Sequence, residues 1–149
     1  MRVRRVITTR DGGASGPPYS SFNLGGHVGD RPEAVTANRE RLAEGIGLPI
    51  ERLVWMEQVH GRAVTVVEGP RAQPVPASDA LVTRAPRLAV VALVADCVPI
   101  LLADPAQEIV AVVHAGRAGS RAGVLPATLE AMRCLGARPE RVEALLGPA

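Results

Sequence analysis

Residues 88–116, LAVVALVADCVPILLADPAQEIVAVVHAG, decide the fold of this 149-residue chain. The stretch contains three apolar runs: Leu88–Ala95, Pro99–Ala103 and Ile109–Val113. Short runs of apolar side chains between polar or turn residues are typical of strands that are buried on both faces of a sheet. They predict the centre of a sheet in which the polar residues Asp96, Cys97 and His114 lie at strand ends.

The flanking sequence predicts further strands and two helices. The additional strands are expected at Leu53–Met56, Ala63–Glu68, Asp79–Thr83 and Val142–Leu146. A first helix is expected to begin at Asp30, which can cap it with Glu33 three residues later, and to end at Gly47. A second helix is expected over about residues 122–135. This order of elements favours a mixed α/β domain with several buried strands.

The composition restricts the class of protein. With 47% hydrophobic and 21% charged residues, the chain can form a core, and residues 1–149 are expected to be a single domain. Its 17 basic residues, all arginine, face 15 acidic ones, and it has one Trp, one Tyr and one Phe, so nucleic-acid binding is not expected. The longest apolar run is too short to span a membrane. Two cysteines favour free thiols in a cytoplasmic protein.

Three residues with metal-ligand chemistry are predicted at strand ends: His60, Cys97 and His114. They are too far apart in the sequence for a local metal motif, so their convergence depends on the fold. Two imidazoles and one thiolate would suit Zn²⁺, with a fourth position left for an activated water. The same set would suit one copper ion, for which Met56 is the candidate axial thioether. A centre with several coppers is excluded because three histidines are too few to ligate it.

Other roles for these residues stay open from the sequence. Cys97 could be a nucleophile with His114 as its base, or a buried small side chain beside hydrogen-bonded histidines. Asp96 lies between an apolar run and Cys97, where an unpaired carboxylate is costly. It could orient a ligand histidine, carry a proton as a catalytic acid or base, or cap the strand end.

Candidate anion contacts come from two loops. Residues 114–123 join a strand to a helix and contain three glycines, while Arg117 and Arg121 add hydrogen-bond donors. Such a loop can hold a phosphate, or can be a tight packing turn. In the Gly-, Ser- and Pro-rich N-terminal segment, Arg10 and Asn23 have polar groups that could reach a ligand.

Several segments together resemble the family of multicopper polyphenol oxidoreductase, or laccase-domain, proteins. In chain order these are Thr8–Ser15, Ser21–Gly25, His27–Asp30, Asn38–Arg39, Gln58–Gly61, Ser78–Ala80, Ala95–Cys97 and Val113–Gly116. Members of this family are regarded as purine nucleoside phosphorylases that also deaminate adenosine, and are also named peptidoglycan editing factors. The resemblance implies a layered α-β-β-α sandwich related to toxin-type cysteine deamidases. It also implies that the metal ligands are His60, Cys97 and His114.

The chain departs from the family pattern at two places. Arg117 and Ala118 stand where the family commonly has Trp-Arg, which removes a large aromatic surface. The sequence ends at Gly147–Ala149, where the family continues into a Cys-Tyr-containing stretch. The domain is therefore expected to lack its C-terminal part.

The resemblance and the residues together give one hypothesis. The protein is a zinc-dependent purine nucleoside phosphorylase, converting adenosine, inosine or methylthioadenosine and phosphate into a free base and ribose 1-phosphate, with adenosine deaminase activity. Asp96 is expected to be catalytic, and Arg10, Asn23 and Arg117 to contact substrate. A monomer is favoured, and copper is the alternative metal. The alternative functions are a metal-free Cys–His hydrolase or deamidase, and a peptidoglycan-precursor editing or binding factor.

Overall fold

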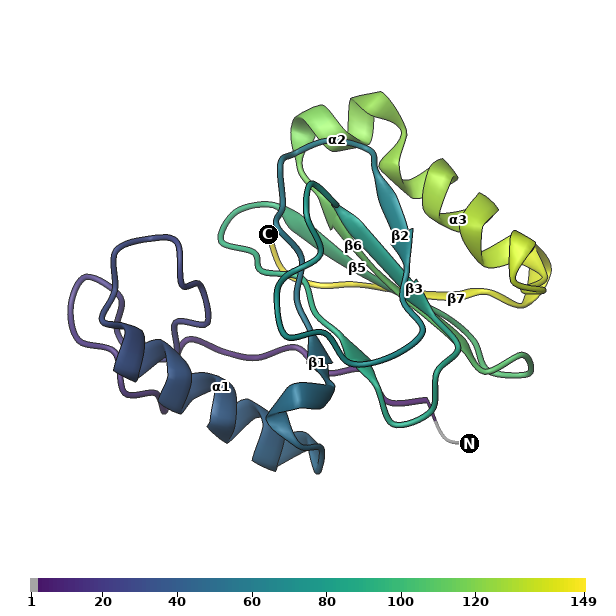
Figure 1. Cartoon of the computed structure of the whole chain (residues 1–149). Helices are drawn as coiled ribbons and strands as arrows, with labels where there is room; N and C mark the ends of the chain where they lie inside the picture. Colours follow the sequence, from purple (N-terminus) through teal and green to yellow (C-terminus); the bar gives the residue numbers. More distant parts are fainter. Residues whose placement is uncertain (1–2) are drawn as a thin grey trace. The chain divides into compact units, whose positions relative to one another are not determined.

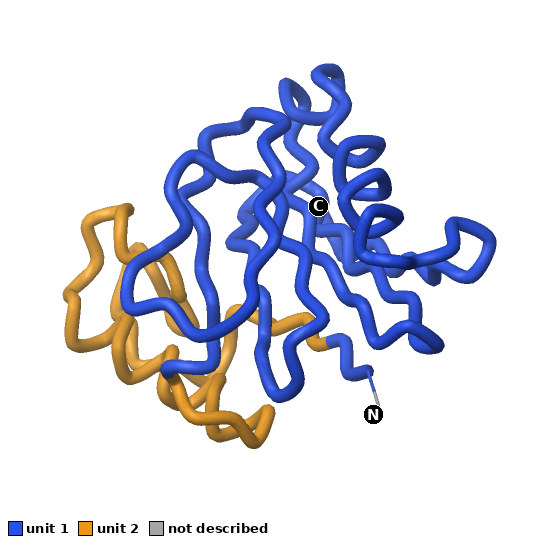
Figure 2. The backbone as a smooth tube through the Cα atoms, turned by 45° about the vertical axis from the view of Figure 1, so that its right-hand side comes forward, with its two compact units in different colours: residues 1–5, 51–149 blue, residues 6–50 orange. Residues whose placement is uncertain are grey.

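The computed structural model describes residues 3–149. They form two compact units, one of residues 6–50 and a larger one of residues 51–149 together with residues 3–5 (Figure 2). Among residues 3–149, no helix combines the length and the apolar character that crossing a membrane requires.

The smaller unit contains one helix, α1 (Pro32–Ile46). Gly47 ends it as predicted, in the left-handed conformation with φ of 71° that glycine adopts without steric cost. The predicted cap at Asp30 is wrong, because Arg31 occupies the cap position without a side-chain hydrogen bond. The Asp30 carboxylate instead accepts hydrogen bonds from Ser15 Oγ (2.6 Å) and Asn23 Nδ2 (3.0 Å).

The long N-terminal loop of this unit is ordered around a buried amide. Asn38 of α1 accepts a hydrogen bond from the N–H of Ala14 (2.7 Å) and donates to the carbonyl of Asn23 (2.8 Å) and to Ser15 Oγ (3.0 Å). This one side chain therefore fixes both limbs of the loop on the helix.

In the larger unit, two long strands form the centre of a five-stranded sheet (Figure 1). They are β5 (Val98–Asp104) and β6 (Ile109–Ala115), which pair antiparallel as the apolar runs predict. The sheet order is β2-β3-β6-β5-β7, with β2 at Val64–Val66, β3 at Ala80–Thr83 and β7 at Glu143–Leu146. β2 and β3 are parallel, whereas β3–β6 and β5–β7 are antiparallel.

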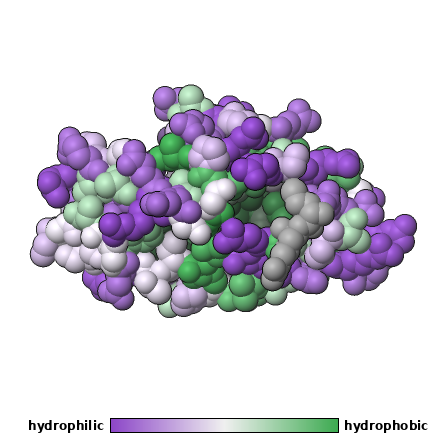
Figure 3. All heavy atoms as spheres, turned by 90° about the horizontal axis from the view of Figure 1, so that it is seen from below, coloured by the Kyte–Doolittle hydropathy of each residue, from purple (hydrophilic) through white to green (hydrophobic). Residues whose placement is uncertain are grey.

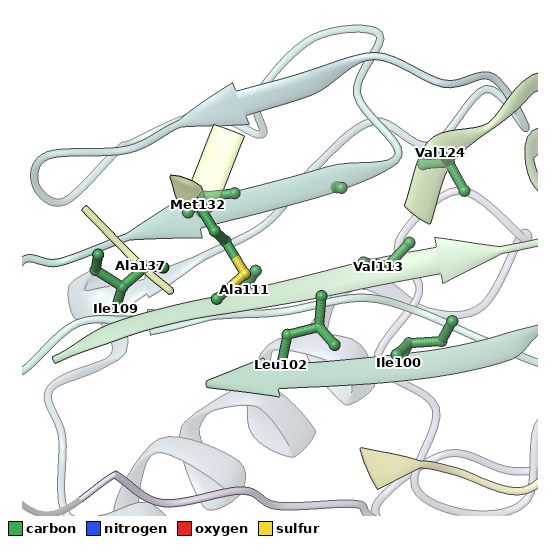
Figure 4. Close-up of a cluster of buried hydrophobic side chains, with 10 residues drawn as sticks. Ile100, Leu102, Ile109, Ala111, Val113, Val124, Met132 and Ala137 are labelled. Carbon is green, nitrogen blue, oxygen red and sulfur yellow. The ribbon is translucent and has the colours of Figure 1, made fainter. Parts of the chain in front are cut away.

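Both faces of this sheet are covered. The helix α3 (Val124–Cys134) lies along one face, and its Met132 side chain points at the strands, towards Ala111 (Figure 4). On the other face, Leu81 and Val112 pack in a second apolar cluster. This cluster contains residues of the segments around a small parallel sheet formed by β1 (Leu53–Val54) and β4 (Ala89–Val90). The prediction of a mixed α/β fold is confirmed, with two sheets and flanking helices.

The strand predicted at Leu88–Ala95 is largely wrong. Ala89–Val90 alone are in a strand, and the following residues are partly exposed, with Val94 at 41%. A side chain replaces the neighbouring strand here, because Gln58 accepts a hydrogen bond from the N–H of Leu93 and donates one to its carbonyl, both at 2.7 Å. The apolar composition therefore indicated a buried strand where the backbone has no full-length partner.

The helix predicted over 122–135 begins two residues late and is preceded by another. Residues that were expected to form a loop make the short helix α2 (Arg117–Ala122). Gly123, with φ of 89°, ends α2 and starts α3, so one glycine changes the chain direction between two helices.

The edge strand β7 pairs with β5 but adds little to the hydrophobic core. All four of its residues are exposed, with Leu146 at 62%. Other exposed large apolar side chains of the larger unit include Val59, Val66 and Val94. Figure 3 shows one face of the molecule, on which apolar side chains gather near the centre among hydrophilic ones.

Candidate metal centre

One end of the five-stranded sheet brings the three predicted ligands together. The antiparallel register pairs Val98 with Ala115, so Cys97, just before β5, and His114, near the end of β6, lie at the same end of the sheet. His60 comes from the loop between β1 and β2. The candidate metal centre consists of His60, Cys97 and His114.

The donor atoms of this centre are close enough for one ion. One ring nitrogen of each histidine and the Cys97 sulfur all lie within 4.8 Å of one another. The two imidazole rings are edge-to-face, with centroids 4.7 Å apart and planes at 80°. Bond lengths of about 2.0–2.3 Å place the donors of a tetrahedral zinc site roughly 3.3–3.8 Å apart. Small side-chain rotations would therefore close the observed group around an ion.

Two glycines allow the chain to approach this centre. A Cβ at Gly116 would lie 3.1 Å from Cys97 Sγ and 3.2 Å from His60 Cδ2. A Cβ at Gly119 would lie 2.7 Å from the carbonyl oxygen of Gly61, closer than real Cβ atoms come. Of the three glycines in residues 114–123, Gly116 and Gly119 therefore permit a close approach, at the ligands and at the loop that carries His60, whereas a Cβ at Gly123 would meet nothing within 4 Å.

A buried carboxylate, Asp79, connects two of the three candidate ligands. Its Oδ1 is 2.8 Å from His114 Nδ1 and accepts the N–H of His60 at 2.9 Å. Its Oδ2 accepts the N–H of Gly61 (2.8 Å) and of Val59 (3.2 Å). Burial acts to raise the pKa of Asp79, but the hydrogen bonds from His114 and from the three N–H groups outweigh it and lower that pKa.

The environment of Cys97 opposes a free thiolate. Burial, and then the negative charges of Asp96 and Asp79, raise the pKa of the Cys97 thiol. Its sulfur lies 3.7 Å from Asp96 Oδ1. Cysteine nucleophiles have the opposite surroundings, which lower the thiol pKa. A bound cation would reverse this balance, because coordination deprotonates a thiol.

An open pocket of about 520 Å³ adjoins the centre. Its lining residues are His60, Asp96, Cys97, Arg117, Ala118 and Arg121. The two arginines lie on α2, one turn apart, and both are exposed. The volume is in the range of small-molecule sites, and guanidinium groups favour an anionic ligand.

The remaining predicted site residues have other surroundings. Asp96 is exposed beside Cys97, and the contact to a ligand histidine that was considered for it belongs to Asp79. Met56, considered as a copper ligand, packs in the apolar cluster with Val54 and Val67.

Arg10 and Asn23 belong to the smaller unit. The guanidinium of Arg10 donates to the carbonyl of Ser20 (3.0 and 3.2 Å), and Asn23 bonds to Gly25 and Asp30. Their contact with substrate stays a prediction.

Asp79 is the site residue that sequence reasoning left without a role. It lies in the segment Ser78–Ala80, which is part of the family resemblance, and it is the first residue of the predicted strand Asp79–Thr83. A carboxylate at the start of a buried strand is the signal that could have identified it.

The fold and the site together define a mixed α/β protein with a His–Cys–His group, suited to a transition metal, at one end of its sheet. A family model described as multi-copper polyphenol oxidoreductase laccase matches residues 4–149. The chain belongs to this family, as the sequence motifs indicated.

Similar proteins carry a more specific name. A purine nucleoside phosphorylase of Mycobacterium tuberculosis is 56% identical over 149 residues, which are 100% of this chain and 60% of that protein. The purine nucleoside phosphorylase YfiH of Escherichia coli is 43% identical over 99% of this chain and 58% of its own length. The crystal structure of YlmD from Geobacillus stearothermophilus has a TM-score of 0.91 at 35% identity, covering 95% of this chain and 56% of that one. The chain therefore spans about 60% of the length of its relatives.

Proposed function

We propose that this protein is a zinc-dependent purine nucleoside phosphorylase that also deaminates adenosine, with the zinc held by His60, Cys97 and His114. The observation that carries the proposal is the convergence of these three donors, within 4.8 Å, beside a pocket with two arginines. Relatives that are 56% identical over the whole chain and are named purine nucleoside phosphorylase support the choice of reaction.

The donor set and the space fit such an ion. Two imidazoles and one thiolate leave a fourth position of a tetrahedral ion open, and Gly116 keeps the space between the ligands free of a Cβ. When bound, zinc would supply a Lewis acid next to the pocket. Cys97 would lose its proton when the ion binds, because the positive charge of the ion would stabilise the thiolate that burial and the nearby carboxylates destabilise.

The arginines of α2 would hold the phosphate. Arg117 and Arg121 line the pocket and lie on the same side of one helical turn. Their guanidinium groups can donate several hydrogen bonds to a phosphate oxyanion and orient it towards C1′ of the ribose. The predicted substrate contacts Arg10 and Asn23 remain part of the proposal.

Asp96 would carry the proton. Its carboxylate is exposed, lines the pocket and lies next to Cys97, where it can accept a proton from substrate or return one to the departing base. We also infer, from the two free thiols, that the protein works in a reducing compartment such as the cytoplasm.

The test is to incubate the purified, zinc-loaded protein with adenosine, inosine or methylthioadenosine, with and without phosphate, and to separate the products by chromatography. Phosphorolysis should require phosphate and should give the free base with ribose 1-phosphate, or with 5-methylthioribose 1-phosphate when the substrate is methylthioadenosine, whereas inosine from adenosine should form without phosphate. Cys97→Ser should abolish both reactions, and Cys134→Ser, which changes the exposed second cysteine, should leave them unchanged. The absence of metal-dependent turnover would overturn the proposal. Activity that survives chelation but not thiol alkylation would favour a metal-free cysteine hydrolase.

A further inference from the structure

The larger unit contains a carboxylate whose hydrogen bonds go beyond what the sheet requires. Asp79 is fully buried and immediately precedes β3, and its side chain makes four hydrogen bonds. Three come from the consecutive N–H groups of residues 59–61, and the fourth joins His114 Nδ1. All four reach the candidate metal centre or the loop that carries one of its ligands.

The bond to His114 selects the form of that imidazole. An ionised carboxylate accepts hydrogen bonds and cannot donate one, so a 2.8 Å contact requires the proton of neutral His114 to be on Nδ1. The lone pair is then on Nε2. The choice of tautomer at a metal-ligating histidine is commonly made by such a partner on its other nitrogen.

The other three bonds shape the loop that presents His60. His60 has φ of 59°, in the left-handed region that residues other than glycine seldom adopt. Such a conformation persists where the surroundings determine it. Here the hydrogen bonds from three successive N–H groups to the Asp79 carboxylate fix the backbone conformation of His60. The backbone of Gly119, on α2, also lies close to the carbonyl of Gly61.

We infer that Asp79 is a positioning residue that holds both histidines of the candidate centre at once, fixing the tautomer of His114 and the backbone conformation of His60. The inference rests on the proposed function, because it assigns Asp79 a task towards the ion that these histidines would bind. It makes the centre preorganised: two of its three ligands depend on one buried charge.

The sequence offers a matched control. Asp104 is equally buried, is the last residue of β5, and accepts the N–H groups of Ala106, Gln107 and Arg138 at 2.9–3.3 Å. Among residues 3–149, none of these hydrogen-bond partners of the Asp104 side chain belongs to the candidate metal centre. Asp79→Asn and Asp104→Asn therefore remove the same charge from similar surroundings, with only one of them next to the ligands.

The experiment measures Zn²⁺ affinity by chelator competition, and the visible spectrum of the Co²⁺-loaded protein, in wild type and in both variants. Asp79→Asn should weaken Zn²⁺ binding by about 10–100-fold and alter the Co²⁺ spectrum, because partners of ligand histidines typically contribute that much. Asp104→Asn should lower the melting temperature without changing either metal readout. Equal affinities and spectra in wild type and Asp79→Asn would overturn the inference while leaving the proposed function intact.

A second measurement needs no variant. Nitrogen NMR of metal-free wild type, at a pH where the His114 ring carries a single proton, should show that proton on Nδ1, and a proton on Nε2 instead would overturn the inference. If wild type showed the Nδ1 proton but bound neither Zn²⁺ nor Co²⁺, the proposed function would fail together with the metal task of Asp79. The failures of the two claims are therefore distinguishable.

Discussion

Each end of the five-stranded sheet has a buried aspartate that accepts backbone hydrogen bonds, but the two aspartates have different roles. At one end, β5 turns into β6, and the buried Asp104 accepts three backbone N–H groups that close this turn and fix residue 138 beside it. At the other end, the buried Asp79 also accepts three backbone N–H groups, but its fourth bond goes to a histidine.

The difference shows what separates a structural carboxylate from one at a candidate site. The hydrogen-bond partners of the Asp104 side chain are backbone N–H groups, so its role is to stabilise the fold. The partners of Asp79 belong to the loop of His60 and to the ring of His114, and the donors of both lie within 4.8 Å of Cys97. Burial of the two carboxylates is the same, so the chemistry of the neighbours distinguishes the two ends.

The largest expected effect is the loss of a ligand at the Asp79 end. Structural zinc sites bind with about 10–16 kcal/mol shared among four ligands, so removing one should cost roughly 3 kcal/mol, or about a hundredfold in affinity. Cys97→Ser and His114→Ala should therefore weaken Zn²⁺ binding by about this factor in chelator competition. Cys134→Ser, on the exposed side of α3, should bind as wild type. Wild-type affinity in Cys97→Ser would remove the distinction between the two ends.

The next effect concerns the packing behind the His60 loop. In Gly119→Ala, the new Cβ would meet the Gly61 carbonyl at 2.7 Å, so the backbone of α2 or of the loop must move. Overpacking of this kind should lower the free energy of unfolding by about 1–3 kcal/mol, and the displaced loop should weaken Zn²⁺ binding as well.

Urea denaturation and chelator competition measure the two effects of Gly119→Ala. The control is Gly69→Ala, where a Cβ meets nothing within 4 Å, and it should change neither quantity. A variant as stable as wild type would contradict the tight approach of α2 to the loop.

A smaller effect is expected for the pocket arginines. Arg117→Ala or Arg121→Ala should raise the KM for phosphate by about fivefold, because an exposed, solvent-screened charge contributes roughly 1 kcal/mol. The difference should shrink as the salt concentration increases. Initial rates at varied phosphate measure it, with Arg84→Ala, an exposed arginine outside the pocket lining, as the control. An unchanged KM in both variants would exclude this phosphate position.

The smallest expected effect is the pH-dependent contribution of Asp104 to stability, at the end of the sheet opposite to Asp79. The N–H of Arg138, with those of Gln107 and Ala106, lowers the pKa of Asp104 against the effect of burial. A carboxyl with a lowered pKa in the folded state stabilises the protein above its unfolded-state pKa of 3.8, and loses this contribution as the pH falls through the folded-state value.

Urea denaturation between about pH 5 and pH 2.5 follows this contribution. Wild type should lose stability towards the acid end more steeply than Asp104→Asn, which has no carboxyl to protonate there. Asp11→Asn, in an exposed loop, should behave as wild type. Parallel pH profiles for wild type and Asp104→Asn would contradict the role of this carboxylate.

The sequence predicted the elements whose signals are local. Gly47 ends α1, and the runs before and after Asp104 form β5 and β6, because residue type and spacing determine such features directly. Local reasoning was wrong where a distant side chain intervenes. The side-chain amide of Gln58 makes hydrogen bonds to the backbone N–H and carbonyl of Leu93, and the Asp30 carboxylate accepts hydrogen bonds from Ser15 and Asn23. Neither interaction can be predicted from the neighbouring residues in the sequence.

The candidate site divides in the same way. Cys97 and His114 could be placed at one end of the sheet, because they flank adjacent strands. His60 joins them through a loop with positive φ, fixed by a carboxylate 19 residues further along the chain. That tertiary contact, and with it the role of Asp79, required the structure.

The central claim is tested most directly by X-ray absorption at the zinc edge of the loaded protein, combined with the zinc content per chain. We expect about one zinc per chain, with one sulfur at about 2.3 Å and two imidazole nitrogens at about 2.0–2.1 Å in its coordination shell. A shell without sulfur, or one with sulfur that persists in Cys97→Ser, would contradict a centre formed by His60, Cys97 and His114.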